Sequence, residues 1–390
     1  MSEQHSTGIP DFPGSHPAGE EPAAEAGPPP PGSPIGIVEV AAASGFSPAT
    51  VSRALRGMPG VSASTRVAVE KAAAALGYFP SPSAAALITG RTNTFGIVAP
   101  WVSRWFFSAV IDGAHEVFGA AGYDLLLYPM SSPTDSRGRY VLDSRSMSKR
   151  IDGLLALNVP LMHSSLDSLH HLRVPVVTVG TAVQGLSGVL VDNEEVGRVA
   201  TRHLLALGHR RIAFFGDDDA GNQDGFTVAT DRNRGYELEL RAAGIEPDPA
   251  LHQVSGFSIE GGEAALHRLF SRSDIALPTA IFAVSDEVAM GAIYAARSRG
   301  LSVPGDLSII GVDGHDFSYL FDLSTVAQPV KDQGRIAARL LLEQVNSPTP
   351  RPPSVVSVGC ELIRRGTTGP LGIPLTGGAG GCDHTVAPVA

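Results

Sequence analysis

A short segment near the start of the chain carries a guanidinium and hydroxyl groups on the outer face of an expected helix. Val51 and Leu55 lie four residues apart and should face a core. The outward side chains are then those of Pro48, Ala49, Ser52 and Arg53. Arg53 can donate two hydrogen bonds to O6 and N7 of guanine, and the hydroxyls of Thr50 and Ser52 can reach phosphates. This face predicts DNA recognition, although an arginine on a plain helical bundle is the more frequent situation for such a segment alone.

Three short helices are expected to position this face. Gly45 can supply the positive φ of a turn, and Ser47 is a natural N-cap that is followed by proline at the first helical position. The expected helices cover residues 37–44, residues 48–55 and a segment that begins after Ser62 and ends at Gly77. Three helices around a small core of Ala, Val and Leu predict a helix-turn-helix head.

From residue 93 onward, short apolar runs alternate with amphipathic stretches. The runs at 95–99, 123–128, 153–157, 176–179, 212–215, 280–284 and 307–312 are typical of buried strands. The stretches at 107–121, 195–207, 233–243 and 286–299 are typical of helices. This alternation predicts an α/β body with parallel sheets covered by helices on both faces. The number of alternating strand and helix units, about ten, favours two doubly wound subdomains over one.

Composition restricts the remaining possibilities. Residues 1–34 and 369–390 are rich in Pro, Gly and Ala, which predicts a disordered extension and a flexible tail. No long apolar run or secretion signal is present, so we expect a cytoplasmic protein without membrane association. The chain carries a net charge of −10, yet residues 36–92 contain five basic and two acidic side chains, a net +3. A basic head on an acidic body fits DNA binding, although a solvated helical face would give the same count.

Several motifs extend this interpretation to a family. The run 40–55 is followed by Gly60-Val61-Ser62 and by 76–80, and the body contains Gly208-His209-Arg210-Arg211 and Gly311-Val312-Asp313. Over about residues 36–368 the chain resembles the LacI/GalR family of bacterial regulators. The resemblance implies a homodimer that binds a double-stranded DNA operator and represses or activates transcription under the control of a small ligand. In the family this ligand is commonly a sugar or a purine, and we favour a sugar.

The resemblance also divides the chain and implies a hinge. We expect a helix-turn-helix domain at 35–80, a hinge helix and linker at 81–92, and an effector-binding and dimerisation domain of periplasmic-binding-protein type at 93–368. Ser81 can cap the hinge helix, which continues through Ala84 to Leu87. So short a helix should fold mainly when docked, with Leu87 as a wedge in the minor groove. An incidental leucine in a linker is the alternative.

The family binds its effector between the two subdomains. The positions that match ligand-contacting residues are Arg232, Phe257, Ser285, Asp313 and Gln328. Arg232 offers forked donors and Asp313 two acceptor oxygens, which suits a hydroxyl-rich ligand. We also expect Trp101 or Trp105 to touch the ligand, because both follow the first strand of the body. Gly180 stands where relatives often carry Asp, so one polar contact is expected to be missing.

Two other classes of protein share part of this pattern. A sugar-binding protein of a transport system would have a similar body but no such head, and an enzyme acting on sugars or nucleosides would need a catalytic constellation. The chain has no Gly-x-Ser-x-Gly, no phosphate-binding loop and no His-Glu-x-x-His. We therefore expect no catalytic residue, no metal site and no cofactor.

Overall fold

A computed structural model describes residues 35–79, 90–129, 147, 149–159, 169, 171–217 and 227–371. The chain divides into two compact units between residues 81 and 82, here called the head and the body. Ser81, Ala84 and Leu87 of the predicted hinge lie outside the described residues, as do the predicted extension and all but the first residues of the predicted tail. No described helix has the length and apolar character needed to cross a membrane.

The head is built from three helices, as predicted. They are α1 (Ile37–Ser44), α2 (Pro48–Leu55) and α3 (Ala63–Leu76). Ser47 accepts a hydrogen bond from the Thr50 amide at the start of α2, and Gly45 ends α1 with a φ of 76°. Val40, Val51 and Val69 are fully buried, so one valine from each helix forms the centre of the core.

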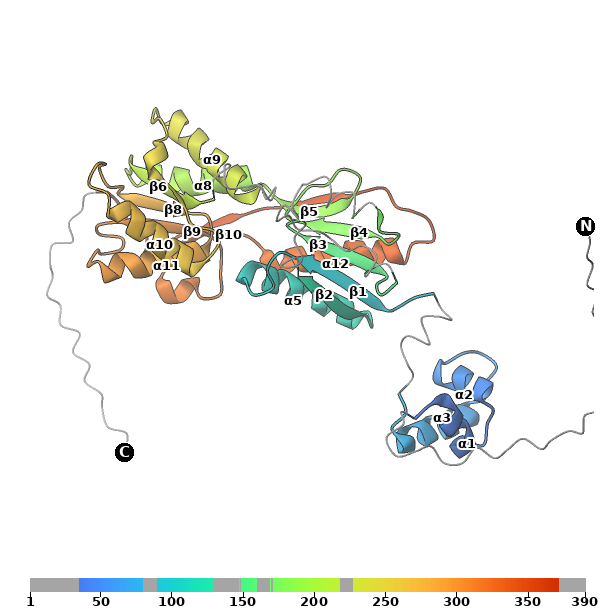
Figure 1. The fold of residues 1–390 in the computed structure, drawn as a ribbon. Helices are drawn as coiled ribbons and strands as arrows, with labels where there is room; N and C mark the ends of the chain where they lie inside the picture. Colours follow the sequence, from blue (N-terminus) through green and yellow to red (C-terminus); the bar gives the residue numbers. More distant parts are fainter. Residues whose placement is uncertain are drawn as a thin grey trace, which may run out of the picture. The chain divides into compact units, whose positions relative to one another are not determined.

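The body begins with a sheet of six parallel strands, here called the N lobe. Its order is β11-β5-β4-β3-β1-β2. The strands are β1 (Thr94–Ala99), β2 (Asp124–Pro129), β3 (Gly153–Leu157), β4 (Val176–Val179), β5 (Ser187–Val191) and β11 (Val355–Val358). Helices α5 (Trp105–Ala120) and α12 (Val330–Val345) pack together against this sheet (Figure 1).

The second sheet, with its helices, forms the C lobe, in the order β12-β10-β9-β8-β6-β7. Its strands are β6 (Ile212–Gly216), β7 (His252–Val254), β8 (Ala280–Ala283), β9 (Ser308–Asp313), β10 (Ser324–Ala327) and β12 (Glu361–Ile363), and the β10–β12 pair is antiparallel. Helices α8 (Asn193–Ala206) and α9 (Val228–Ala242) cover one face, and α10 (Ile259–Phe270) and α11 (Asp286–Ser298) cover the other (Figure 1). The short helices η1 (Pro249–Leu251) and η2 (Ser318–Phe321) complete the lobe.

The chain passes between the lobes three times, after β5, after β10 and after β11. Each passage is short, so the carboxyl ends of strands from both sheets lie close to the junction. In an open α/β sheet, ligands bind outside the carboxyl ends of the strands. The topology therefore places any cleft of the body between the two lobes.

Reciprocal glycines let the helices of each pair approach closely. A Cβ on Gly113 of α5 would lie 2.0 Å from the Lys331 carbonyl oxygen, and one on Gly334 of α12 would lie 2.0 Å from that of Val110. The same arrangement joins α8 to α9 and α10 to α11, through Gly197 with Gly235 and Gly262 with Gly291. No side chain fits at these contacts, so glycine at each of these positions sets how closely the helices pack.

Candidate DNA-binding face and effector cleft

The predicted recognition residues lie on the free side of α2. Pro48, Ala49 and Arg53 are exposed, and Ser52 is half-buried. Arg53 Nε donates to the Ala49 carbonyl oxygen at 3.3 Å, so the side chain lies back along its own helix. The hydroxyl of Thr50, also half-buried, is 2.9 Å from that of Ser47 and takes part in the cap.

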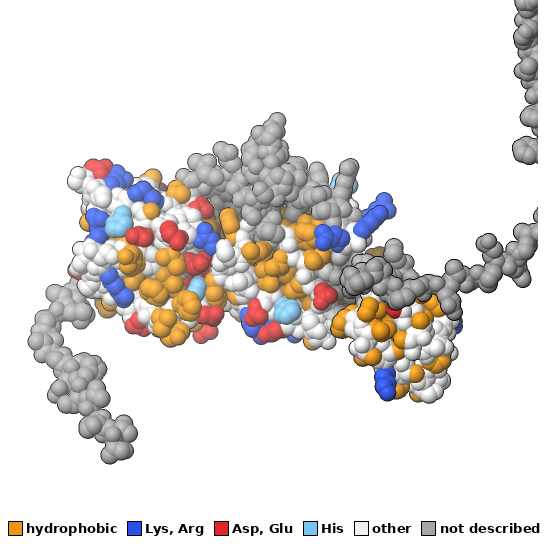
Figure 2. Space-filling model, turned by 60° about the horizontal axis from the view of Figure 1, so that its bottom comes forward, with side chains coloured by type: hydrophobic (Ala, Val, Ile, Leu, Met, Phe, Trp, Pro, Cys, Tyr) orange, Lys and Arg blue, Asp and Glu red, His pale blue; other side chains and the backbone are white. Residues whose placement is uncertain are grey.

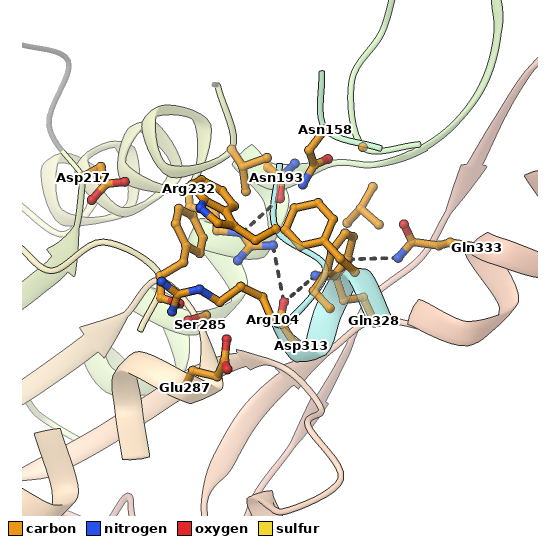
Figure 3. Close-up of a pocket in the computed structure, with 17 residues that line it drawn as sticks. Arg104, Asn158, Asn193, Asp217, Arg232, Ser285, Glu287, Asp313, Gln328 and Gln333 are labelled. Atoms are coloured by element: carbon orange, nitrogen blue, oxygen red, sulfur yellow. Dashed lines mark hydrogen bonds and ion pairs between the residues drawn. The ribbon is translucent and has the colours of Figure 1, made fainter. Parts of the chain in front are cut away.

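A cavity that is partly open to solvent lies between the lobes of the body. Both lobes and the passage after β10 contribute to its walls (Figure 3). The predicted effector residues that line it are Trp101, Arg232, Phe257, Ser285, Asp313 and Gln328. The structure therefore brings together six of the seven candidates, which are spread over more than two hundred positions of the sequence.

Arg232 is the most constrained side chain of the cavity. It is 3% exposed and projects from α9. Its Nε donates to Asn193 Oδ1 at 3.0 Å, one terminal nitrogen donates to the Val284 carbonyl oxygen, and the other lies 3.7 Å from Asp313 Oδ1. Gly197 allows α8 to approach the Arg232 backbone, since a Cβ there would lie 2.1 Å from its carbonyl oxygen. The guanidinium is therefore fixed before any ligand arrives.

Asp313 ends β9 in a strained conformation. Its φ of 114° is one that L-residues rarely adopt, and such strain persists only where the surroundings enforce it. The carboxylate accepts a 2.6 Å hydrogen bond from Gln328. Burial raises the pKa of Asp313 to about 6, although Arg232 and the hydrogen bond from Gln328 partly oppose this shift.

The residues at the start of α11 hold the segment that follows Asp313. Ser285, which lines the cavity, is the N-cap of α11 and accepts from the Val288 amide. Asp286 is fully buried and accepts a 2.7 Å hydrogen bond from the His315 amide. Burial raises the pKa of Asp286 well above its usual range, and the nearby charge of Asp313 adds to this effect.

Aromatic rings form another part of the wall. Trp101, Phe106 and Phe107 come from the N lobe, and Phe257 comes from the C lobe. Trp101 and Phe106 lie 6.0 and 5.4 Å from Phe107 between ring centroids, and Phe107 is also part of the N-lobe core. Because aromatic faces pack against the apolar faces of sugar rings and bases, this wall can hold a ring of either kind.

Trp105 does not line the cavity. Its Nε1 donates to Asp316 Oδ2 at 3.0 Å, and its ring lies 4.8 Å from that of His315. Its neighbour Arg104 does line the cavity and donates to the Phe257 carbonyl oxygen. These two residues at the start of α5 therefore connect the N lobe to the C lobe.

Six polar residues of the cavity were missed by sequence reasoning: Arg104, Asn158, Asn193, Asp217, Glu287 and Gln333. Asn158 follows β3 directly and Asn193 follows β5 by two residues, so a search for polar residues after each buried strand would have found both. Gly180 is also explained, because a Cβ there would lie 1.6 Å from Asn158 Oδ1. Asn158 thus provides a polar group beside the position where relatives often carry Asp.

The described residues contain no group of three or more His, Cys, Asp or Glu side chains that could hold a metal ion. Cys360, in the passage after β11, is a free thiol among them.

Comparisons with known proteins agree on one family. Residues 36–81 match the bacterial regulatory proteins of the lacI family, and residues 201–368 match the periplasmic binding protein-like domain. The transcriptional repressor CytR of Escherichia coli is 34% identical over 334 residues, which are 85% of this chain and 95% of that protein.

Solved structures give the same result. The complex of the transcriptional regulator CelR with cellobiose is 27% identical, covers 85% of this chain and 99% of that one, and has a TM-score of 0.61. The lac repressor dimer bound to operator shares the fold, with a TM-score of 0.73 over 86% of this chain and all of that one at 23% identity. This chain therefore belongs to the lacI family of bacterial regulatory proteins and is a ligand-responsive regulator of transcription.

Proposed function

We propose that this protein is a homodimeric repressor that binds a pseudopalindromic operator and is controlled by a small sugar-like molecule in the cleft of the body. The observation that carries the proposal is the cavity between the lobes, which combines a fixed Arg232–Asp313 pair with aromatic rings. A charged pair that accepts and donates hydrogen bonds suits hydroxyl groups, and the rings suit the apolar face of a sugar. The cellobiose complex of the related CelR supports a sugar as the ligand.

In the head, Arg53 reads a guanine. The exposed Pro48 and Ala49 cannot hydrogen-bond a base, so they either contact thymine methyls or tolerate several bases. Thr50 and Ser52 contact phosphates and set the position of α2. The predicted hinge contacts of Ser81, Ala84 and Leu87 remain part of the proposal. An arginine that lies along its own helix is free to extend once DNA is present.

In the body, Arg232, Ser285, Asp313 and Gln328 supply polar contacts to the ligand, and Trp101 and Phe257 supply ring contacts. Trp105 acts through its contact with Asp316 on the other lobe. A ligand shifts an equilibrium between two lobe arrangements only by the difference in its affinity for them, so its contacts must include both lobes. The cavity satisfies this condition.

An apolar surface of the C lobe provides a face for the second subunit. Tyr294 on α11 is 60% exposed, and Phe317, Tyr319 and Leu320, in and beside η2, are 57 to 65% exposed. Helix α11 contacts η2, and Figure 2 shows hydrophobic side chains gathered on the C lobe. Large exposed apolar groups of this kind mark interaction sites, and a two-fold operator requires a two-fold protein.

The proposal makes the protein a regulator without enzymatic activity that acts on DNA in the cytoplasm. A thermal-shift screen of neutral sugars and nucleosides tests it. A ligand at a hundred times its dissociation constant should stabilise the body by about 2.7 kcal/mol. The same ligand should change operator affinity, and the proposal fails if a ligand of the cavity leaves that affinity unchanged.

A further inference from the structure

We propose that Gln333 is a specificity-determining residue whose Oε1 accepts a hydrogen bond from the effector. The effector should present an O–H or N–H group at this point, and molecules that place a phosphate or carboxylate there should be rejected. This inference rests on the proposed function of the cleft and assigns it a ligand class.

Gln333 lies in the first turn of α12, on the N lobe, and is 1% exposed. It lines the cavity and ends a chain of hydrogen bonds that crosses between the lobes (Figure 3). Gln333 Nε2 donates to Gln328 Oε1 at 3.0 Å, and Gln328 Nε2 donates to Asp313 Oδ1 at 2.6 Å. Two amides therefore connect Gln333 to the carboxylate of the C lobe.

This series of hydrogen bonds fixes the orientation of each side-chain amide group. An amide oxygen and nitrogen have nearly the same shape, so their assignment depends on their partners. An ionised carboxylate can only accept, so Gln328 must turn its NH2 group to Asp313 and its oxygen to Gln333. Gln333 must then turn its own NH2 group to that oxygen. Its Oε1 is left over, and it is buried without a partner in the structure.

A buried acceptor without a partner is rare in proteins, because its loss of water is not compensated. Asn158 Oδ1 is a second buried, unpartnered side-chain oxygen on the N-lobe side of the same cavity. Both oxygens belong to neutral groups that need a donor. A ligand hydroxyl or amine would meet this need in both places.

The charged groups of the cavity also favour a neutral ligand. Arg232 is already shared between Asn193, Val284 and Asp313, and Arg104 donates to the Phe257 carbonyl oxygen. The positive charges of the cavity thus have partners within the protein. A phosphate or carboxylate would bring only acceptors to oxygens that also accept, and repulsion would result.

The test uses the full-length protein with D-glucose, D-ribose, cellobiose and cytidine, each beside an anionic analogue: glucose 6-phosphate, ribose 5-phosphate, cellobionate and cytidine 5′-monophosphate. Affinities are measured by calorimetry for the wild type, Gln333→Leu and Gln333→Met. Gln344→Leu is the control, because Gln344 lies on the same helix but donates to Ser187 outside the cavity. Melting temperatures without ligand identify any variant that fails to fold, and the second substitution then replaces it.

We expect a neutral member to bind the wild type and the Gln344→Leu control equally. Both Gln333 variants should bind it at least about tenfold more weakly, which corresponds to about 1.4 kcal/mol for one hydrogen bond. The anionic analogue should bind more weakly than its neutral parent. The inference is overturned if a folded Gln333 variant binds the neutral ligand as tightly as the wild type, or if only anionic members bind. If Gln333 matters for binding but the ligand leaves operator affinity unchanged, the proposed function fails and this inference stands.

Discussion

Two arginines show how differently the head and the body are prepared for their partners. Arg53 of the head is exposed, and its Nε bonds only to the backbone of its own helix. Arg232 of the body is buried, and it contacts Asn193, Val284 and Asp313. The first can reorganise on a DNA surface at little cost, whereas the second is held in place in advance.

The difference reflects the two kinds of partner. DNA is large and brings its own rigid pattern of acceptors, so a small head needs little more than a well-placed helix. A small ligand offers few contacts. The protein side chains that make them must be oriented before the ligand binds, because ordering them on binding would reduce the affinity. If this comparison is correct, a substitution in the cleft should weaken ligand binding by disturbing the orientation of neighbouring side chains. A substitution on α2 should instead change the affinity for single base pairs of the operator.

The largest effect is expected for Asp313→Ala. This substitution removes the carboxylate that orders Gln328 and Gln333 and leaves Arg232 without its charged partner. The thermal shift of about 2.7 kcal/mol expected at a hundred times the dissociation constant should disappear, while ligand-free operator binding stays intact. Asp306→Ala, on an exposed turn of the same lobe, is the control. A normal ligand response of Asp313→Ala would show that the effector binds elsewhere.

Arg53→Ala should have the next largest effect. Losing a bidentate contact to guanine costs about 1 to 3 kcal/mol in each half-site of the operator. Binding should be measured against operators changed one base pair at a time, with Arg56→Ala as the control, because Arg56 Nε is also bonded to its own helix. Specificity should relax at one position of each half-site. Uniform weakening at all positions would mean that Arg53 meets only phosphate.

The close packing of α5 and α12 supports the cleft, and Gly113→Ala should disturb it. The new Cβ would lie 2.0 Å from the Lys331 carbonyl oxygen, so unfolding should become easier by about 1 to 3 kcal/mol. Gly119→Ala on the same helix meets nothing closer than 3.9 Å and should leave stability equal or slightly higher. Chemical denaturation of both variants measures the difference. Equal loss of stability in the two would show that the close helix contact is not what matters.

The smallest effect is expected from pH. Burial raises the pKa of Asp313 to about 6, so the folded protein holds a proton there in a range where the unfolded chain has lost it. This group therefore stabilises the fold less as pH rises toward 6. Effector binding has the opposite dependence if it needs the ionised carboxylate, and affinity should fall about tenfold per pH unit below 6. Calorimetry at several pH values should show this slope in the wild type but not in Asp313→Asn.

The sequence predicted the head more completely than the cleft. All three helices of the head were expected at their observed positions, because Gly45, Ser47 and Ser62 are local signals for the ends of helices. The α/β fold and its long strands were also expected, because buried parallel strands are continuous apolar runs. The strands β5, β7, β10, β11 and β12 and the helices α10 and α12 were not among the predicted elements. Strands β7 and β12 have only three residues each, too few for a pattern.

The cleft could be predicted only in part. Arg232 and Asp313 were found through family resemblance, and the structure places both in the cavity. Gln333 was missed because its importance arises from its hydrogen bond to Gln328 and, through Gln328, from Asp313, which lies on the other lobe. Trp105 was expected near the ligand but contacts the other lobe, because successive residues at the start of α5 point in different directions.

The most direct test of the account is operator affinity measured with and without a cleft ligand, in the wild type and in Asp313→Ala. A fluorescent duplex selected from random sequences by the full-length protein serves as the operator. We predict that a saturating neutral ligand found by thermal shift changes wild-type affinity by about 5- to 150-fold, the usual range of allosteric coupling, and leaves Asp313→Ala unchanged. Unchanged wild-type affinity with the cleft fully occupied would contradict the account.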